Sequence, residues 1–179
     1  MKSPAPWKGV VDRRSGLEAW REASGYTSVD PAPPLTPPTE RAEVAALRGR
    51  LLDRGRPMFQ RMRAVFALRN QGGPDAVEAL AAAFADPSAL LRHEIAYVLG
   101  QMQDAHAVPF LTRVLETKDE HVMVRHEAAE ALGAIGEPGS VEVLRRYLSD
   151  PAPEVSESCE VALDLIAWVN SEDLEYADG

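Results

Sequence analysis

The stretches SALLRHEIAYVLGQMQ (residues 88–103) and MVRHEAAEALGAIG (residues 123–136) carry the same Arg-His-Glu triplet at one position of consecutive internal repeats. Two further markers share this register. Ala-Leu or Val-Leu pairs recur at spacings of 31, 33 and 31 residues, and a Val followed three residues later by Leu recurs at spacings of 31 and 33. Two independent markers in one register are hard to obtain by chance, so the sequence predicts a repeat array.

Each repeat contains two apolar stretches with helical periodicity, separated by Gly and Pro residues that break helices. We expect a helix over residues 40–54 to start the array. First helices of the following repeats are expected over residues 59–70, 88–102, 122–135 and 154–169, and second helices over 75–84, 105–116 and 140–148. The predicted fold class is therefore all-α, a HEAT-like helical-hairpin solenoid of about four repeats.

The first 40 residues have a different composition. They contain seven of the fourteen prolines, several of them in the run 30–38. Such a run cannot form a helix and is typical of an extended linker. We therefore predict an N-terminal extension and Pro-rich linker over residues 1–39 and a HEAT-like repeat domain over residues 40–179.

Composition excludes several functional classes. The net charge is −9 and falls on residues 41–179, which disfavours nucleic acid as a partner and favours a cationic ligand or a basic protein surface. The sequence has no apolar run long enough to span a membrane, and we expect no signal peptide because the first residues lack its apolar stretch. One cysteine fits a reducing compartment. We expect a cytoplasmic protein that does not contact a membrane.

The His-Glu pairs predict a metal site. Aligned repeats place His93-Glu94 and His126-Glu127 at the same position, where the flanking repeats have Met62-Arg63 and Glu157-Ser158. Neighbouring helices of a solenoid lie about 8–10 Å apart, so His93 and His126 can converge on one ion while Glu94 or Glu127 completes the set. Two imidazoles and a carboxylate suit an oxygen-activating iron, whereas zinc with these ligands would suit hydrolysis.

Other residues of similar chemistry receive ordinary structural interpretations. His106 and His121 are expected at helix starts or in loops, as exposed or capping residues. Cys159 is not expected to have a direct role. Arg92 and Arg125 are expected to pair with acidic neighbours and to orient the site.

The repeats, together with YTSVDPAPP (residues 26–34), RMRAVFALRNQGG (61–73), ESCEVALD (157–164) and the final YADG, resemble the deoxyhypusine hydroxylases. Members of that family are HEAT-repeat di-iron monooxygenases that hydroxylate the deoxyhypusine side chain of a translation factor. The resemblance implies two Fe²⁺ ions per complete site. It also implies that His93, Glu94, His126 and Glu127 are metal ligands, and that Met123 is a substrate-binding residue.

The chain departs from the family in one respect. The family has two lobes with two His-Glu pairs in each, and this sequence matches the linker and the C-terminal lobe. Three interpretations follow: an inactive fragment or short form, a half-site completed by a second copy or a separate N-terminal lobe, or a protein with one metal and another role. A non-enzymatic HEAT module that binds a partner and keeps relic His-Glu pairs is the alternative from a different functional class.

Overall fold

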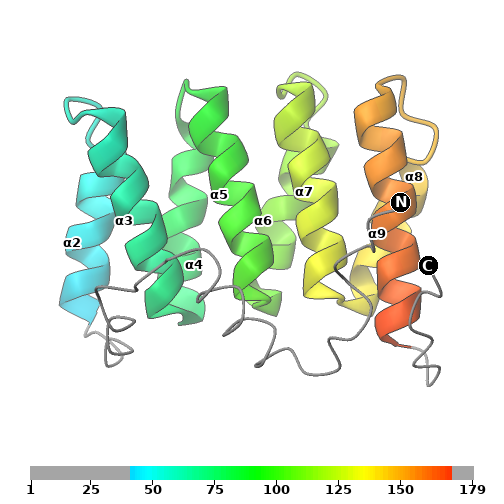
Figure 1. The fold of residues 1–179 in the computed structure, drawn as a ribbon, viewed down its shortest axis with the longest axis horizontal. Coiled ribbons are helices and arrows are strands. Elements are labelled where there is room, and N and C mark those ends of the chain that lie inside the picture. Colours follow the sequence, from blue (N-terminus) through cyan, green and yellow to red (C-terminus); the bar gives the residue numbers. More distant parts are fainter. Residues whose placement is uncertain (1–40, 171–179) are drawn as a thin grey trace, which may run out of the picture. The chain divides into compact units, whose positions relative to one another are not determined.

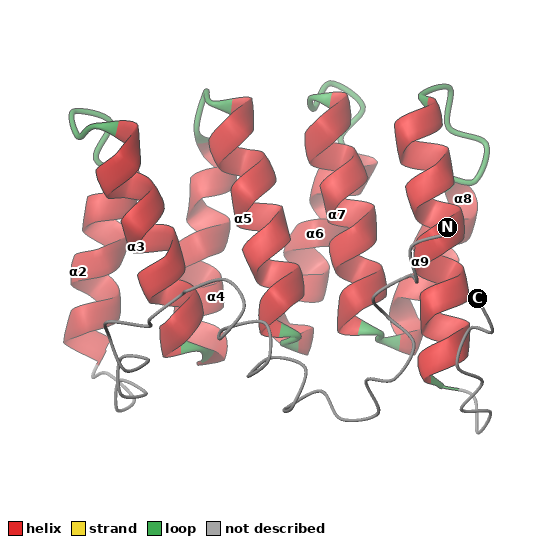
Figure 2. Ribbon diagram, viewed as in Figure 1, coloured by secondary structure: helices red, strands yellow, loops and turns green. Residues whose placement is uncertain are grey.

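The structure is a computed structural model that describes residues 41–170, all within the second of the two units into which the chain divides, Thr36–Gly179. The predicted extension and linker, residues 1–39, lie outside the described residues, as does the start of the expected first helix. In the described part the chain forms helices and loops and contains no strand (Figure 2). The predicted all-α repeat fold is therefore confirmed.

The helices alternate between two layers. One layer contains α3, α5, α7 and α9 side by side, and α2, α4, α6 and α8 lie behind them (Figure 1). This alternation is the arrangement expected when each repeat is a helical hairpin stacked on the next. In chain order the α-helices are α2 Arg41–Leu52, α3 Met58–Gln71, α4 Gly73–Ala81, α5 Ala89–Met102, α6 Val108–Glu116, α7 Val122–Ile135, α8 Val141–Arg146 and α9 Pro153–Val169.

The predicted bounds of the first helices agree with the structure to within about a turn. The second helices are shorter than predicted because part of each folds as a tighter 3₁₀ turn. Ala82–Ala85 extends the end of α4 in this form, and Ala105–Ala107 and Pro138–Ser140 precede α6 and α8. Each of these tight segments leads the chain from one layer of helices to the other.

Local chemistry sets the ends of the two helices that carry the His-Glu pairs. The Ser88 side chain accepts a hydrogen bond from the Leu91 N–H at the start of α5, and His121 does the same for Met123 at the start of α7. At its other end α7 stops at Gly136, whose φ of 76° favours glycine. His121 therefore has the capping role expected from the sequence.

The repeat markers form the core between the two layers. Leu68, Leu99 and Leu132 of the first marker are fully buried, and so are Leu80, Leu111 and Leu144 of the second marker. The same register position thus points inward in successive repeats. The markers are regularly spaced because each repeat must bury the same positions against its neighbours.

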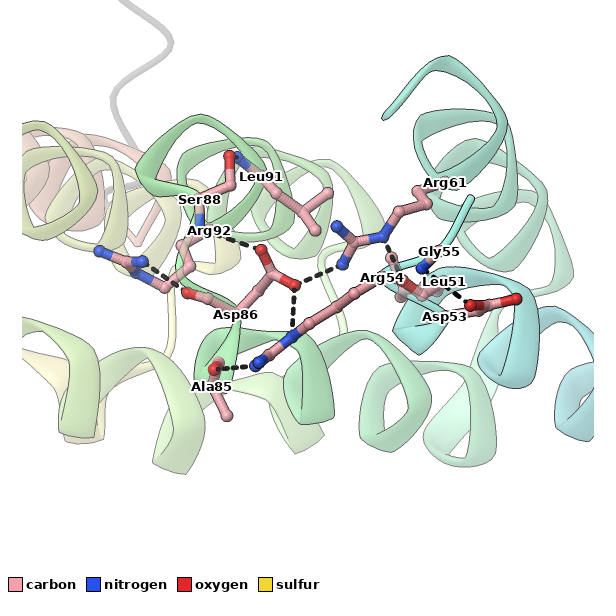
Figure 3. Close-up of polar contacts among 10 residues, drawn as sticks. All are labelled: Leu51, Asp53, Arg54, Gly55, Arg61, Ala85, Asp86, Ser88, Leu91 and Arg92. Atoms are coloured by element: carbon pink, nitrogen blue, oxygen red, sulfur yellow. Dashed lines mark hydrogen bonds and ion pairs between the residues drawn. The ribbon is translucent and has the colours of Figure 1, made fainter. Parts of the chain in front are cut away.

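Successive repeats are joined by buried or partly buried ion pairs. Arg61 on α3 bonds Asp86 at 2.5 Å and also donates to the carbonyl of Leu51 (Figure 3). Two further arginines at the equivalent position form the same kind of pair with an acid that precedes the next first-layer helix: Arg92 with Glu120, and Arg125 with Asp150. The expected pairing of Arg92 and Arg125 with acidic neighbours is confirmed, and these pairs lie at repeat junctions.

The junction carboxylates predict an acid-sensitive stability. Hydrogen bonding to Arg125 holds the pKa of Asp150 below its ordinary value. Burial alone would raise the pKa of Asp86, but the hydrogen bonds from Arg61 and the Ser88 N–H and nearby positive charges lower it overall. A folded pKa below the unfolded value of about 3.9 stabilises the fold above that pH, and this stabilisation is lost as pH falls through the folded pKa.

We therefore expect the difference in unfolding free energy between the wild type and Asp150→Asn to be constant above about pH 5 and to shrink below about pH 4. Urea unfolding at a series of pH values measures this difference. A difference that does not change down to about pH 3 would show that the Asp150 carboxylate is not the ionised partner described above.

Candidate metal centre

The His-Glu pairs lie on α5 and α7, which approach each other closely. A Cβ atom added to Gly100 of α5 would lie 2.9 Å from the Cα of Ala131 on α7, so only glycine permits this separation. Further along the same pair of helices, His93 Nε2 lies 3.1 Å from Glu127 Oε2. The Glu127 side chain is only 10% exposed. The close packing thus brings the imidazole of one repeat onto the carboxylate of the next.

The next pair of helices repeats this contact with a different acceptor. His126 Nδ1 lies 2.6 Å from Ser158 Oγ on α9, and Ser158 aligns with Glu127 and Glu94 in the repeat register. In both cases the histidine of one repeat meets the second residue of the aligned pair in the following repeat. The two predicted histidines therefore contact different neighbours, Glu127 and Ser158.

Within the described part of the chain, the group of metal-capable side chains consists of His126, Glu127 and Glu130, whose ligand atoms lie within 4.8 Å of one another. Sequence reasoning missed Glu130, because the aligned residues of the other repeats are Phe66, Tyr97 and Val161 and no repeat marker points to it. The signal was local: His126 and Glu130 are four residues apart and so share one face of α7.

The environment of this group is strongly negative. Burial raises the pKa of Glu127 above its ordinary value, and the charges of Glu130 and Glu94 raise it further, while His126 opposes them. The surrounding sequence adds to this field, since residues 71–170 hold seventeen acidic and six basic residues, whereas residues 41–70 hold two acidic residues and eight arginines. A bound cation would relieve the repulsion among the carboxylates.

The remaining predicted residues lie around this group. Glu94 follows His93 on α5 and is half-buried, and Met123 lies in the first turn of α7 with 40% of its surface exposed. Met123 precedes Glu127 by four residues, so both are on one face of α7. The metal-ligand roles of the His-Glu residues and the substrate role of Met123 stay predictions.

A cleft adjoins the carboxylates. It has a volume of about 420 Å³ and is lined by residues of α5, α7 and α9, with Glu127 and Glu130 among them. The lining also includes small residues of α7, Ala131 and Ala134, and larger side chains of α5 and α9. Those larger side chains are Tyr97, Val161 and Leu165. The cleft thus combines apolar side chains with two carboxylates.

Two other potentially reactive residues lie outside the group. His106 is exposed and pairs with Glu78 at 3.2 Å, as its predicted ordinary role requires. Cys159 is fully buried, and burial raises the pKa of its thiol to about 11. A thiol that remains protonated and has no access to solvent is a poor nucleophile or ligand.

The comparisons with known proteins agree with the fold. The family profile for HEAT repeats matches residues 44–122 and 80–164. The chain belongs to the HEAT-repeat family. In addition, this HEAT-repeat chain is 57% identical over 157 residues to the deoxyhypusine hydroxylase of Gallus gallus, an alignment that covers 88% of the chain and 51% of that relative. The Mus musculus deoxyhypusine hydroxylase is 52% identical with the same coverage.

A solved structure gives the same result. The structure of human deoxyhypusine hydroxylase in complex with glycerol matches with a TM-score of 0.73 and 49% identity, covering 78% of this HEAT-repeat chain and 48% of that one. The resemblance to the deoxyhypusine hydroxylases is therefore confirmed. The chain spans about half the length of the curated relatives it matches.

The helices are too short or too polar to span a membrane. This holds for the residues that the structure describes.

Proposed function

We propose that this chain supplies one half of a di-iron centre that hydroxylates the deoxyhypusine side chain of a translation factor in the cytoplasm. A second copy or a separate lobe supplies the other half. The observation that carries the proposal is the contact between the two His-Glu pairs across α5 and α7, with His93 Nε2 3.1 Å from Glu127 Oε2. The chain that carries it is at least half identical to deoxyhypusine hydroxylases.

The side chains fit iron chemically. Imidazole nitrogens and carboxylate oxygens together are the donors of non-haem ferrous sites, and two of each are present in His93, Glu94, His126 and Glu127. When bound, iron would supply the activation of dioxygen. His93, Glu94, His126 and Glu127 would hold the metal, and Glu127 is the carboxylate that contacts His93 from the neighbouring repeat.

The proposed substrate side chain is long, aliphatic and positively charged, and the surface of α7 suits it. Met123, Glu127, Glu130 and Ala134 follow one another along a single face of that helix. Met123 would contact the aliphatic part of the substrate side chain. The cleft that Glu127 helps to line offers apolar side chains and carboxylates to the rest of it. The negative field of residues 71–170 favours the cationic side chain over a neutral one.

The test measures iron per chain and solution mass after anaerobic reconstitution of the full chain with ferrous iron. We expect a dimer with about one ferrous ion per chain, as a two-metal site shared by two chains requires. His126→Ala should lose this iron and any hydroxylation of the deoxyhypusine-containing factor. His106→Ala is the matched control, because His106 is a surface histidine outside the group, and it should keep both.

Two outcomes would contradict the proposal. One is iron content that His126→Ala leaves unchanged. The other is a metal-free, colourless chain both alone and when mixed with the complementary half of the Gallus gallus enzyme, which is the behaviour expected of a non-enzymatic HEAT module.

A further inference from the structure

The two site histidines use opposite ring nitrogens. His93 presents Nε2 to Glu127 at 3.1 Å, whereas His126 presents Nδ1 to Ser158 Oγ at 2.6 Å. Ser158 is itself buried, with 6% of its surface exposed. Because Nδ1 of His126 is occupied by the serine, Nε2 is the nitrogen left for a metal ion.

A second contact of the serine decides where the protons lie. Ser158 Oγ is 3.5 Å from Glu130 Oε1, and an ionised carboxylate can only accept a hydrogen bond. The same carboxylate oxygen lies 3.6 Å from His126 Nδ1, so both neighbours of Nδ1 favour a proton on that nitrogen. The hydroxyl therefore donates its single proton to Glu130 and turns a lone pair toward His126. Nδ1–H of His126 then donates to Ser158, and the neutral ring keeps its free lone pair on Nε2.

The repeat register supports a paired role for Ser158 and Glu130. In the preceding repeat the histidine meets a carboxylate directly, as His93 meets Glu127. Ser158 stands at the aligned position on α9, and the carboxylate is supplied by Glu130 from α7 itself. The residues aligned with Glu130 on the other first-layer helices are apolar or aromatic. An acidic residue is therefore present at this position only in the repeat whose histidine faces a serine. The direct carboxylate is thus replaced by a hydroxyl that is held by a carboxylate.

We propose that Ser158 is a positioning residue that, with Glu130, fixes His126 in the Nδ1–H tautomer and presents Nε2 to the metal. Glu130 then supports this tautomer both through Ser158 and through its own contact with His126 Nδ1. Hydrogen-bonded partners of a metal-binding histidine commonly change metal affinity by about 10–100-fold. The metal part of this assignment rests on the proposed function, but the tautomer is a property of the metal-free chain.

The first readout is ¹⁵N NMR of the labelled, metal-free full chain at a pH where the ring is neutral. We expect the Nδ1–H tautomer for His126 in the wild type. It should shift toward Nε2–H in Ser158→Ala and in Glu130→Ala, and furthest in the double variant, which removes both neighbours of Nδ1. It should be restored in Ser158→Thr, which keeps the hydroxyl. Ser156→Ala is the matched control, since Ser156 lies on the same helix and its hydroxyl donates to the carbonyl of Pro153, away from His126.

The second readout is the affinity for ferrous iron. Ser158→Ala should weaken it by about 10–100-fold, and Ser156→Ala should leave it unchanged. A Nδ1–H tautomer that survives in the double variant Ser158→Ala with Glu130→Ala would overturn the proposal, and so would a shifted tautomer with unchanged iron affinity. If the wild-type chain binds no iron, the proposed function fails, while the NMR result still decides whether Ser158 and Glu130 set the tautomer.

Discussion

Replacing Arg125 with alanine is expected to destabilise the protein by about 3–5 kcal/mol, the range for removing one partner of a buried ion pair. The Arg125 and Asp150 side chains are 7% and 5% exposed. The guanidinium donates to both oxygens of Asp150, bonds the carbonyl of Leu115 at 3.0 Å and lies over the ring of Tyr147. Its removal leaves the buried Asp150 carboxylate without its counter-ion and the Leu115 carbonyl without the hydrogen bond from Arg125.

Arg146→Ala is the matched control for this prediction. Arg146 and Glu116 also form a short pair, at 2.6 Å, but their side chains are 55% and 39% exposed. Water replaces such a contact, so the expected loss is about 0–1 kcal/mol. Urea unfolding at neutral pH measures both variants, and similar losses in the two would contradict the burial argument.

A second variant separates the uncompensated charge from the lost contacts. Asp150→Asn removes the charge but keeps an oxygen that can accept the hydrogen bond from the Ala152 N–H. We expect the double variant Arg125→Ala with Asp150→Asn to be more stable than Arg125→Ala alone, because the buried charge is no longer left without a partner. A double variant less stable than the single one would mean that the cost lies in packing.

The repeat architecture could be predicted because it depends on positions that every repeat must bury. Leu99 and Leu132 occupy one register position, and the need to bury both against neighbouring helices fixes their spacing. The same register located His93 and His126 correctly on adjacent helices. Helix bounds followed from Gly, Pro and capping residues, and the prediction was least accurate for the second helices, where 3₁₀ turns replace part of the α-helix.

The contacts within the site could not be predicted in the same way. Adjacent residues on a helix point about 100° apart, so the neighbour that a side chain meets depends on how the next helix is rotated. The sequence placed His93 and His126 close enough to share an ion, but the structure pairs His93 with Glu127 and His126 with Ser158. Glu130 was missed because it belongs to no repeat marker.

The ion pairs of the arginines were also only partly predictable from the sequence. The sequence predicted acidic partners for Arg92 and Arg125, and the structure supplies them in Glu120 and Asp150. The sequence did not show that these pairs join one repeat to the next, because the partner residues lie 28 and 25 positions later in the chain. Their identity depends on the path of the loop that precedes each first-layer helix.

Gly133→Ala is expected to destabilise the protein by about 1–3 kcal/mol, as overpacking of a close contact does. A Cβ atom at Gly133 would lie 2.8 Å from both the Cα and the Cβ of Ala162, so α7 and α9 must move apart. The same two helices carry His126 and Ser158. Their 2.6 Å contact should therefore lengthen, and the His126 tautomer should change as it does in Ser158→Ala.

Gly49→Ala is the control with the opposite expected sign. Gly49 lies within α2, and an added Cβ atom there meets no atom within 4 Å. Alanine is favoured over glycine in a helix, so this variant should be more stable than the wild type by about 0.5–1 kcal/mol. Urea unfolding of both variants measures whether the free energy of unfolding falls in Gly133→Ala and rises in Gly49→Ala. A Gly133→Ala protein as stable as the wild type would show that α7 and α9 can separate without loss, and that glycine is not required for the contact that positions His126.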